Sequence, residues 1–233
     1  MANILVCDDD KHIVEAIEIY LKNEGYTIYK AYDGIEAIEV LGKEHIDLLL
    51  IDSMMPRMDG IHAILKIRET SSIPIIFLSA KSEDTDKILG LNMGADDYIT
   101  KPFNPLELVA RVKSQLRRYT SFGSAKEEKK QSEYTVGGLT INDETKEVFV
   151  EGEQVKLTPI EYSILLLLVQ HQGKVFSINQ IYESIWNEDA IGADNTVAVH
   201  IRHIREKIEI NPKEPRYLKV VWGVGYKIDK NES

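Results

Sequence analysis

The stretch IDSMMPRMDG, residues 51–60, places an aspartate directly after the apolar run LLLI. A run without any polar position is typical of a strand that is covered on both faces of a parallel sheet. Open α/β sheets bind ligands at the carboxyl ends of their strands, so Asp52 is a candidate for chemistry. Aspartate, proline and glycine are also ordinary turn residues, so Asp52 taken alone could simply open a turn.

Three further apolar runs end in polar side chains. Asp8 and Asp9 follow ILVC, Ser79 follows IIFL, and Lys101 follows YIT. Because the carboxyl ends of parallel strands share one edge of a sheet, we expect these side chains to converge with Asp52. Three close carboxylates cannot all stay ionised without a cation, and a few oxygen ligands with room for water and phosphate suit Mg²⁺. With Lys101 and Ser79 as anion ligands, the pattern predicts a phosphoryl-transfer site with Asp52 as nucleophile.

The first half of the chain alternates between two periodicities. Strands are expected at 3–7, 26–31, 47–51, 73–80 and 96–100, and helices at 11–23, 34–42, 60–69, 84–92 and 104–118. This alternation predicts an α/β fold, a (βα)5 doubly wound parallel sheet, over residues 1–119. Residues 120–133 are small and charged and are expected to form a linker.

Residues 134–233 have a different pattern, with strand-like pieces followed by three helices and a glycine-tipped hairpin at 217–228. The third helix, expected from Asn195 to Ile208, has one apolar face and one cationic, hydrogen-bonding face, which suits the major groove of DNA. Together these elements predict an α+β winged helix-turn-helix domain. A solvated surface is the commoner explanation of a charged helix face, and it is the alternative here.

Composition limits the classes of partner. The chain has 233 residues, a formal net charge of -10 and 43% hydrophobic residues, so DNA binding would need a local patch. Its longest apolar run, residues 164–169, is far too short to cross a bilayer, and no secretory signal is recognisable. The single cysteine, Cys7, cannot form an internal disulfide. We therefore expect a cytoplasmic protein without a membrane partner.

The motifs together resemble one family along essentially the whole chain. VCDDD, IDSMMPRMDG, LSA and GADDYITKPF resemble the receiver domain of two-component response regulators, and LTPIEYSILLLL, NTVAVHIRHIREKI and VWGVGYKI resemble the OmpR/PhoB-type DNA-binding domain. The segments YITKPFNPLELVARVKSQLRRY and VHIRHIREK are most similar to the VanR-type regulators of glycopeptide resistance.

The resemblance implies that a cognate sensor histidine kinase phosphorylates Asp52. Mg²⁺ would be held by Asp9, Asp52 and the Met54 carbonyl, with Asp8 acting largely through water. The phosphoryl group would pair with Lys101, across a Lys101-Pro102 bond that the family usually holds cis. Ser79 would move toward the phosphate, and Tyr98 would turn inward as the switch aromatic.

Phosphorylation would then be coupled to DNA binding by homodimerisation. The positions of the family's intersubunit ion pairs are occupied by Lys87, Asp96, Asp97, Glu107, Arg111 and Arg118. We expect Lys87 to pair with Glu107, Asp97 with Arg111, and Asp96 with Arg118. Solvated surface charges are the alternative, because exposed pairs contribute only about 0–1 kcal/mol each.

Two positions depart from the family's DNA-binding pattern. His203 replaces a base-reading arginine, and Trp222 replaces the arginine that the wing often offers to the minor groove. The partner is expected to be promoter DNA, with RNA polymerase as a further candidate. The other candidate contacts, mostly to phosphate, are Asn195, Thr196, His200, Arg202 and Arg205.

Two alternative functions fit parts of the sequence. A phosphatase of the haloacid dehalogenase type also has a strand that ends in Asp-x-Asp, here Asp8 and Asp10, but it would leave the DNA-binding half without a purpose. A regulator that binds DNA without being phosphorylated is the other. We expect no conventional enzyme, since a receiver catalyses only its own phosphorylation and hydrolysis.

Overall fold

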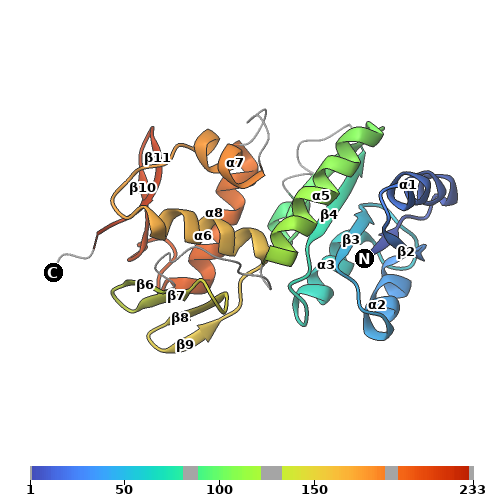
Figure 1. Cartoon of the computed structure of the whole chain (residues 1–233). Coiled ribbons are helices and arrows are strands. Elements are labelled where there is room, and N and C mark those ends of the chain that lie inside the picture. Colours follow the sequence, from blue (N-terminus) through green and yellow to red (C-terminus); the bar gives the residue numbers. More distant parts are fainter. Residues whose placement is uncertain (1, 81–88, 122–132, 187–193, 231–233) are drawn as a thin grey trace. The chain divides into compact units, whose positions relative to one another are not determined.

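The computed structural model of the chain describes residues 2–80, 89–121, 133–186 and 194–230. The chain divides into two compact units, Met1–Tyr119 and Thr120–Ser233 (Figure 1). Of the predicted linker at 120–133, the structure places the first two residues at the end of a helix and Glu133 in a strand. The rest of the predicted linker lies outside the described residues.

The first unit is the predicted parallel sheet with helices on both faces. Its strand order is β2-β1-β3-β4-β5, and every pairing is parallel. The strands are β1 (Asn3–Cys7), β2 (Thr27–Ala31), β3 (Leu48–Asp52), β4 (Ile75–Ala80) and β5 (Asp97–Lys101). The helices are α1 (Lys11–Asn23), α2 (Gly34–Lys43), α3 (Gly60–Arg68) and α5 (Pro105–Ser121). The helix expected at 84–92 falls mostly outside the described residues, and 89–92 are helical.

The all-apolar strand β3 is explained by two separate cores, one on each face of the sheet. Leu49 and Ile51 belong to the core that includes residues of α2 and α3, whereas Leu48 and Leu50 belong to the core that includes residues of α1 and α5. Alternate side chains of a strand point to opposite faces, so a strand covered on both faces has no place for a polar residue before its end. Asp52 is that end.

Aspartates also begin three of the helices in this unit. Asp10, Asp33 and Asp59 are the N-caps of α1, α2 and α3, and each side chain accepts a hydrogen bond from a backbone N–H of the first turn. In the run Asp8-Asp9-Asp10, the third carboxylate therefore has a structural partner. A haloacid dehalogenase-type site would need Asp10 beside Asp8, whereas among the described residues Asp8 clusters with Asp9 and Asp52.

The second unit is the predicted winged helix-turn-helix. An antiparallel sheet of β6 (Glu133–Val136), β7 (Leu139–Asn142), β8 (Glu147–Val150) and β9 (Glu153–Val155) precedes three helices and a hairpin. The helices are α6 (Pro159–Gln170), α7 (Ile178–Trp186) and α8 (Asp194–Ile208), and the hairpin is β10 (Leu218–Val221) with β11 (Gly225–Ile228). Among the described residues, none of the helices has the length and apolar character that spanning a bilayer requires.

The expected apolar face of α8 lies in the core of this unit. Val197, Ile201, Ile204 and Ile208 are at most 2% exposed and pack with α6, α7 and the hairpin. The start of α6 is fixed by a complete capping box of Thr158 and Glu161, with a proline at the first helical position. The core therefore holds α8 by one face.

A carboxylate that the sequence analysis did not single out joins α8 to the hairpin. Glu209 directly follows α8, is 8% exposed, and accepts hydrogen bonds from the backbone N–H groups of Arg216 (2.6 Å), Tyr217 (2.9 Å) and Leu218 (2.8 Å). Three convergent N–H donors satisfy a buried carboxylate and fix where β10 begins. Glu209 thereby sets the position of the wing relative to α8.

Replacing Glu209 with alanine is expected to lower the free energy of unfolding of the second unit by about 3 kcal/mol, because buried N–H groups lose their acceptor. Urea unfolding followed by tryptophan fluorescence reports this unit alone, since both tryptophans, Trp186 and Trp222, lie in it. The control is Glu206→Ala, which removes an exposed pair with Arg202 and should cost under about 1 kcal/mol. Equal losses in the two variants would contradict this role of Glu209.

Candidate functional site

The structure brings the three carboxylates at the ends of β1 and β3 together. Asp8, Asp9 and Asp52 each have a carboxylate oxygen within 4.8 Å of the others. Strand pairing explains this, since Cys7 lies opposite Ile51 in the parallel ladder and the next residue on each strand is an aspartate. Asp8 and Asp52 are 0% and 5% exposed, while Asp9 is exposed. The cluster therefore opens to solvent through Asp9.

Lys101, from the end of β5, reaches into this cluster. Its Nζ lies 2.5 Å from Asp8 Oδ2 and 2.5 Å from Asp52 Oδ1. Burial alone would lower the pKa of Lys101, but the hydrogen bonds to Asp52 and Asp8 outweigh it and the pKa is raised. Burial raises the pKa of Asp8 in spite of the lysine. The ammonium thus contacts two carboxylates of a cluster of three, and the excess of negative charge favours a bound cation.

Ser79 lies on the strand next to β3. It is 0% exposed, and within the part of the chain that the structure describes its hydroxyl has no hydrogen-bond partner. Leu78 is opposite Asp52 in the ladder between β3 and β4, so Ser79 follows one residue later at the same edge. A buried hydroxyl without a partner is costly unless a ligand or water satisfies it. Ser79 is therefore suited to donate to an anion bound at Asp52.

The loop after β3 completes the edge of the site. The Met54 backbone N–H donates to Asp52 Oδ2 at 2.8 Å, and the Met54 side chain is exposed. Gly60 is required at the loop's end, since a Cβ there would meet the carbonyl oxygen of Asp52. The expected cis bond between Lys101 and Pro102 is present. Tyr98 is half-buried on β5, packed against one of the two cores of the sheet.

The donor set fits Mg²⁺. Its members are hard oxygen atoms, carboxylates of which one is solvent-exposed, and such a set leaves positions for water and phosphate oxygens.

The polar face of α8 differs from the expectation at two positions. Thr196 and His200 were expected to contact DNA, but they are only 2% and 1% exposed. The His200 ring centroid lies 5.8 Å from that of Trp186, so this imidazole packs beside a buried aromatic ring instead of projecting into solvent. We therefore remove Thr196 and His200 from the proposed contacts.

Two further candidates on α8 are engaged within the second unit. The His203 side chain is 12% exposed and its Nδ1 lies 4.0 Å from the Glu161 carboxylate. Arg205 donates two hydrogen bonds to the Leu218 carbonyl, at 3.0 Å and 2.9 Å, and burial lowers the pKa of its guanidinium. Arg205 thus attaches the hairpin to α8.

Three of the predicted contacts are accessible. Asn195 and Arg202 are exposed on α8, and Trp222 is 88% exposed at the turn between β10 and β11. This turn also exposes Val224, at 55%, so the tip of the hairpin is apolar.

Comparisons with known proteins agree with both halves of this description. Residues 4–113 match the model "Response regulator receiver domain", and residues 152–228 match "Transcriptional regulatory protein, C terminal". The chain belongs to the OmpR/PhoB-type two-component response regulators. It is therefore a transcriptional regulator with a receiver domain and a DNA-binding domain, and its family is not one of conventional enzymes.

Relatives extend over nearly the whole length of this response regulator. It is 47% identical to "Regulatory protein VanR" of Enterococcus faecium and 46% identical to "Regulatory protein VanRc" of Enterococcus gallinarum, in both cases over 97% of this chain and 98% of the relative. A solved structure of a RitR mutant covers 99% of this chain and all of its own with a TM-score of 0.77 at 25% identity. The family and fold predicted from the motifs are thus confirmed.

Those charges predicted to join two receivers that the structure describes already have partners within one chain. The carboxylate of Asp97 lies 3.2 Å from the Arg111 guanidinium, which also lies 3.1 Å from Glu107. Arg118 is 7% exposed and donates to Ser114 Oγ at 2.8 Å. Lys87, the remaining member of the predicted set, lies outside the described residues.

Asp96 is bound to a residue that the sequence analysis missed. It is 1% exposed, it lies 2.7 Å from the Arg68 guanidinium, and its carboxylate also accepts from the Ile75 N–H at 2.8 Å. Arg68 further donates to the carbonyls of Gly94 and Ile73, at 2.8 Å and 2.7 Å. Within one chain Asp96 thus forms a buried pair with Arg68, and its expected pairing with Arg118 of a second receiver stays a prediction.

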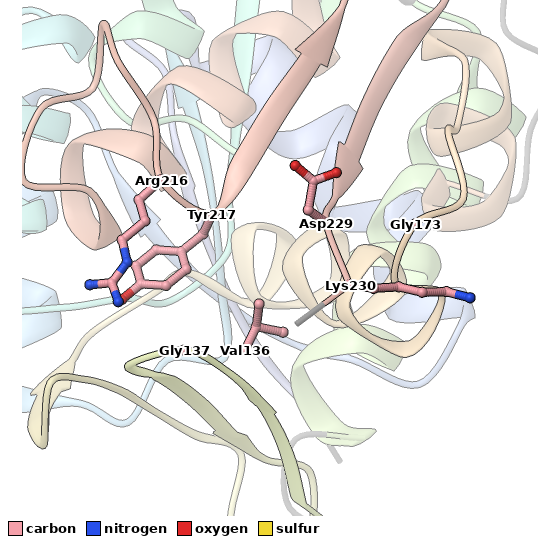
Figure 2. A pocket seen from close by; sticks show the side chains of 7 residues that line it. All are labelled: Val136, Gly137, Gly173, Arg216, Tyr217, Asp229 and Lys230. Atoms are coloured by element: carbon pink, nitrogen blue, oxygen red, sulfur yellow. The ribbon is translucent and has the colours of Figure 1, made fainter. Parts of the chain in front are cut away.

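The DNA-binding domain has a hollow of about 810 Å³ that is unrelated to the carboxylate cluster. Figure 2 shows its lining, in which the Arg216 and Lys230 side chains extend away from each other. Arg216 is paired with Glu151 at 2.6 Å, and Asp229 is paired with Lys227. Among the lining residues that the structure describes, none belongs to the predicted site residues. Its lining residues are Val136, Gly137, Gly173, Arg216, Tyr217, Asp229 and Lys230.

Proposed function

We propose that Asp52 is the phosphoacceptor of this response regulator and that a cognate sensor histidine kinase is the donor. The observation that carries the proposal is the position of Asp52, at the end of β3 with Lys101 at 2.5 Å and Asp8 and Asp9 beside it. An Asp52 oxygen attacks the phosphorus atom, a bond to phosphorus forms, and the bond from phosphorus to the histidine nitrogen of the kinase breaks. The nitrogen keeps the electron pair and takes a proton.

The neighbouring residues support this transfer in different ways. Asp8, Asp9, Asp52 and the Met54 carbonyl would hold Mg²⁺, with Asp8 acting largely through water. When bound, Mg²⁺ neutralises charge that develops on the phosphoryl oxygens. The Lys101 ammonium then pairs with a phosphoryl oxygen in place of the Asp52 carboxylate. The roles of Ser79 as hydrogen-bond donor and Tyr98 as switch aromatic follow the same proposal, as does slow self-catalysed hydrolysis.

The proposed output is promoter binding by a homodimer. A phosphoryl group adds about -1.5 to -2 charges at one edge of the sheet. Of the candidate dimer residues, Asp97, Glu107 and Arg111 form a local ion-pair network that could exchange partners between two receivers, with Lys87 as a fourth member. Asn195, Arg202 and Trp222 are the proposed DNA contacts because they are exposed. A cytoplasmic location and contact with RNA polymerase belong to the same proposal.

Acetyl phosphate with Mg²⁺ tests the phosphoacceptor directly. Intact mass spectrometry should show a gain of about 80 Da in the wild type, from one covalent phosphate, and no gain in Asp52→Ala. Asp47→Ala is the control, since Asp47 lies just before β3, at the opposite edge of the sheet, and should leave the gain intact. Phosphate that remains in Asp52→Ala would contradict the assignment. No phosphate in any variant would favour a regulator that binds DNA without phosphorylation.

Trp222 is predicted to contribute to DNA affinity without contributing charge. Trp222→Ala should weaken binding about ten-fold, as loss of an apolar side chain at base steps does, while leaving the slope of log affinity against log salt unchanged. Arg202→Ala, by contrast, should reduce that slope by about 1. Fluorescence anisotropy of labelled DNA, selected in vitro with the wild type and measured at several salt concentrations, separates the two effects. Unchanged affinity of Trp222→Ala would remove the wing tip from the interface.

A further inference from the structure

The loop between β3 and α3, residues 53–59, is attached to the beginning of α2 by a side chain with no role so far. Arg57 forms an ion pair with Asp33, and its guanidinium also lies 2.6 Å from Glu36 Oε1. Beside this contact the Gly34 N–H donates to the Met58 carbonyl at 3.0 Å. The loop that begins at the predicted phosphoacceptor is therefore fixed to the first turn of another helix.

Both carboxylates that bind Arg57 are themselves held in place. Asp33 is 1% exposed and accepts from the Ile35 N–H at 2.8 Å and from the Glu36 N–H at 3.0 Å. The second oxygen of Glu36 accepts from the Tyr32 N–H at 2.9 Å. Since neither acceptor is free to follow the arginine, the contact restricts the loop and not only the side chain.

The backbone conformation of Arg57 is one that usually favours glycine. Its φ is +62°, in the left-handed region that costs a residue with a β-carbon about 1–2 kcal/mol relative to glycine. Glycine would adopt this conformation at a lower cost. The contacts of the guanidinium with Asp33 and Glu36 give a physical reason for a side chain at this position.

The same loop carries the backbone that the proposed metal site needs. Met54 follows Asp52 by two residues, and its N–H donates to Asp52 Oδ2 at 2.8 Å. The position of the Met54 carbonyl depends on the path of residues 53–59. That path is held at its ends by the Gly60 N–H, which donates to the Ser53 carbonyl at 3.1 Å, and along its length by the attachment at Arg57. Partners outside the coordination sphere hold metal ligands in place, so a shift of this carbonyl would weaken metal binding.

We propose that Arg57 is a positioning residue, which fixes the β3–α3 loop against α2 and so holds the Met54 carbonyl for Mg²⁺. The inference rests on the proposed function of Asp52. It assigns Arg57 no contact with the metal ion or the phosphoryl group.

The test is the dissociation constant of Mg²⁺, measured by isothermal titration calorimetry on the full chain without a phosphoryl donor. Arg57→Ala and Arg57→Gly should both bind Mg²⁺ about ten-fold more weakly, at the lower end of what such outer partners contribute. Arg57→Lys should recover part of the loss, because one guanidinium nitrogen serves both carboxylates and a single ammonium could replace it. Lys66→Ala, which removes an exposed cation from α3, should bind as the wild type does.

The glycine variant separates positioning from backbone strain. Gly relieves the strain of the left-handed conformation, so Arg57→Gly should unfold at a temperature no lower than that of Arg57→Ala in EDTA, and yet bind Mg²⁺ as weakly. Affinities of Arg57→Ala and Arg57→Gly within two-fold of the wild type would overturn the inference while leaving the proposed function intact. Failure of the wild type itself to bind Mg²⁺ or to accept phosphate would overturn both.

Discussion

Replacing Lys101 with methionine is expected to slow phosphorylation of Asp52 by acetyl phosphate about 100- to 1000-fold. Methionine keeps most of the apolar stem and removes the charge that lies 2.5 Å from Asp52 Oδ1. A preorganised donor aimed at developing charge typically contributes a rate factor of this size. The measurement is the initial rate of phosphate incorporation by intact mass at saturating Mg²⁺, and a decrease of less than ten-fold would contradict the role given to Lys101.

The same variant should reveal the structural cost of the carboxylate cluster. Without the lysine, the buried Asp8 carboxylate faces Asp52 with no cation, and removal of one partner of a buried pair costs about 3–5 kcal/mol. We therefore expect the midpoint temperature of receiver unfolding in EDTA to be lower for Lys101→Met than for the wild type. Excess Mg²⁺ should raise it again, since a ligand that binds only the folded state stabilises that state. Scanning calorimetry of the full chain resolves this, with Lys66→Met as the control for loss of charge. Equal midpoint temperatures in EDTA and in Mg²⁺ would argue against a metal site at this cluster.

The convergence of Asp8, Asp52, Ser79 and Lys101 could be predicted because it depends on one general property of folded chains. In a parallel sheet every strand presents its carboxyl end to the same edge, so residues that end apolar runs meet whatever their separation in sequence. Asp52 and Lys101 are 49 positions apart and are joined by a 2.5 Å contact. The alternation of strands and helices was sufficient for this inference.

Arg57, Arg68 and Glu209 could not be found in the same way. Each binds groups whose positions depend on irregular backbone, such as the turn that brings three N–H groups onto Glu209. Periodicity assigns an arginine at the end of a helix to solvent, and only the tertiary fold shows that Arg68 is enclosed by carbonyls and Asp96. A helical wheel likewise places His200 on the polar face of α8 but carries no information on the neighbours that bury it.

Removing the Arg68 guanidinium should destabilise the receiver more than any exposed charge could. Asp96 is 1% exposed and the Arg68 side chain 14%, so Arg68→Met leaves a buried carboxylate without its cation, at a cost of about 3–5 kcal/mol. In scanning calorimetry, Arg68→Met should lower the midpoint temperature of receiver unfolding, whereas Lys66→Met on the same helix should leave that temperature unchanged.

Asp96→Asn decides between a role within one chain and a role between chains. If the carboxylate serves Arg68, the asparagine variant destabilises the unphosphorylated monomer, and the double variant with Arg68→Met loses less stability than the two single losses together, because the two residues share one interaction. If Asp96 instead served a second receiver, the monomer would keep its stability and only self-association after phosphorylation would weaken, which sedimentation velocity measures. Since the buried carboxylate also accepts from the Ile75 N–H at 2.8 Å, it is part of the edge between β4 and the turn before β5, and we expect the first result.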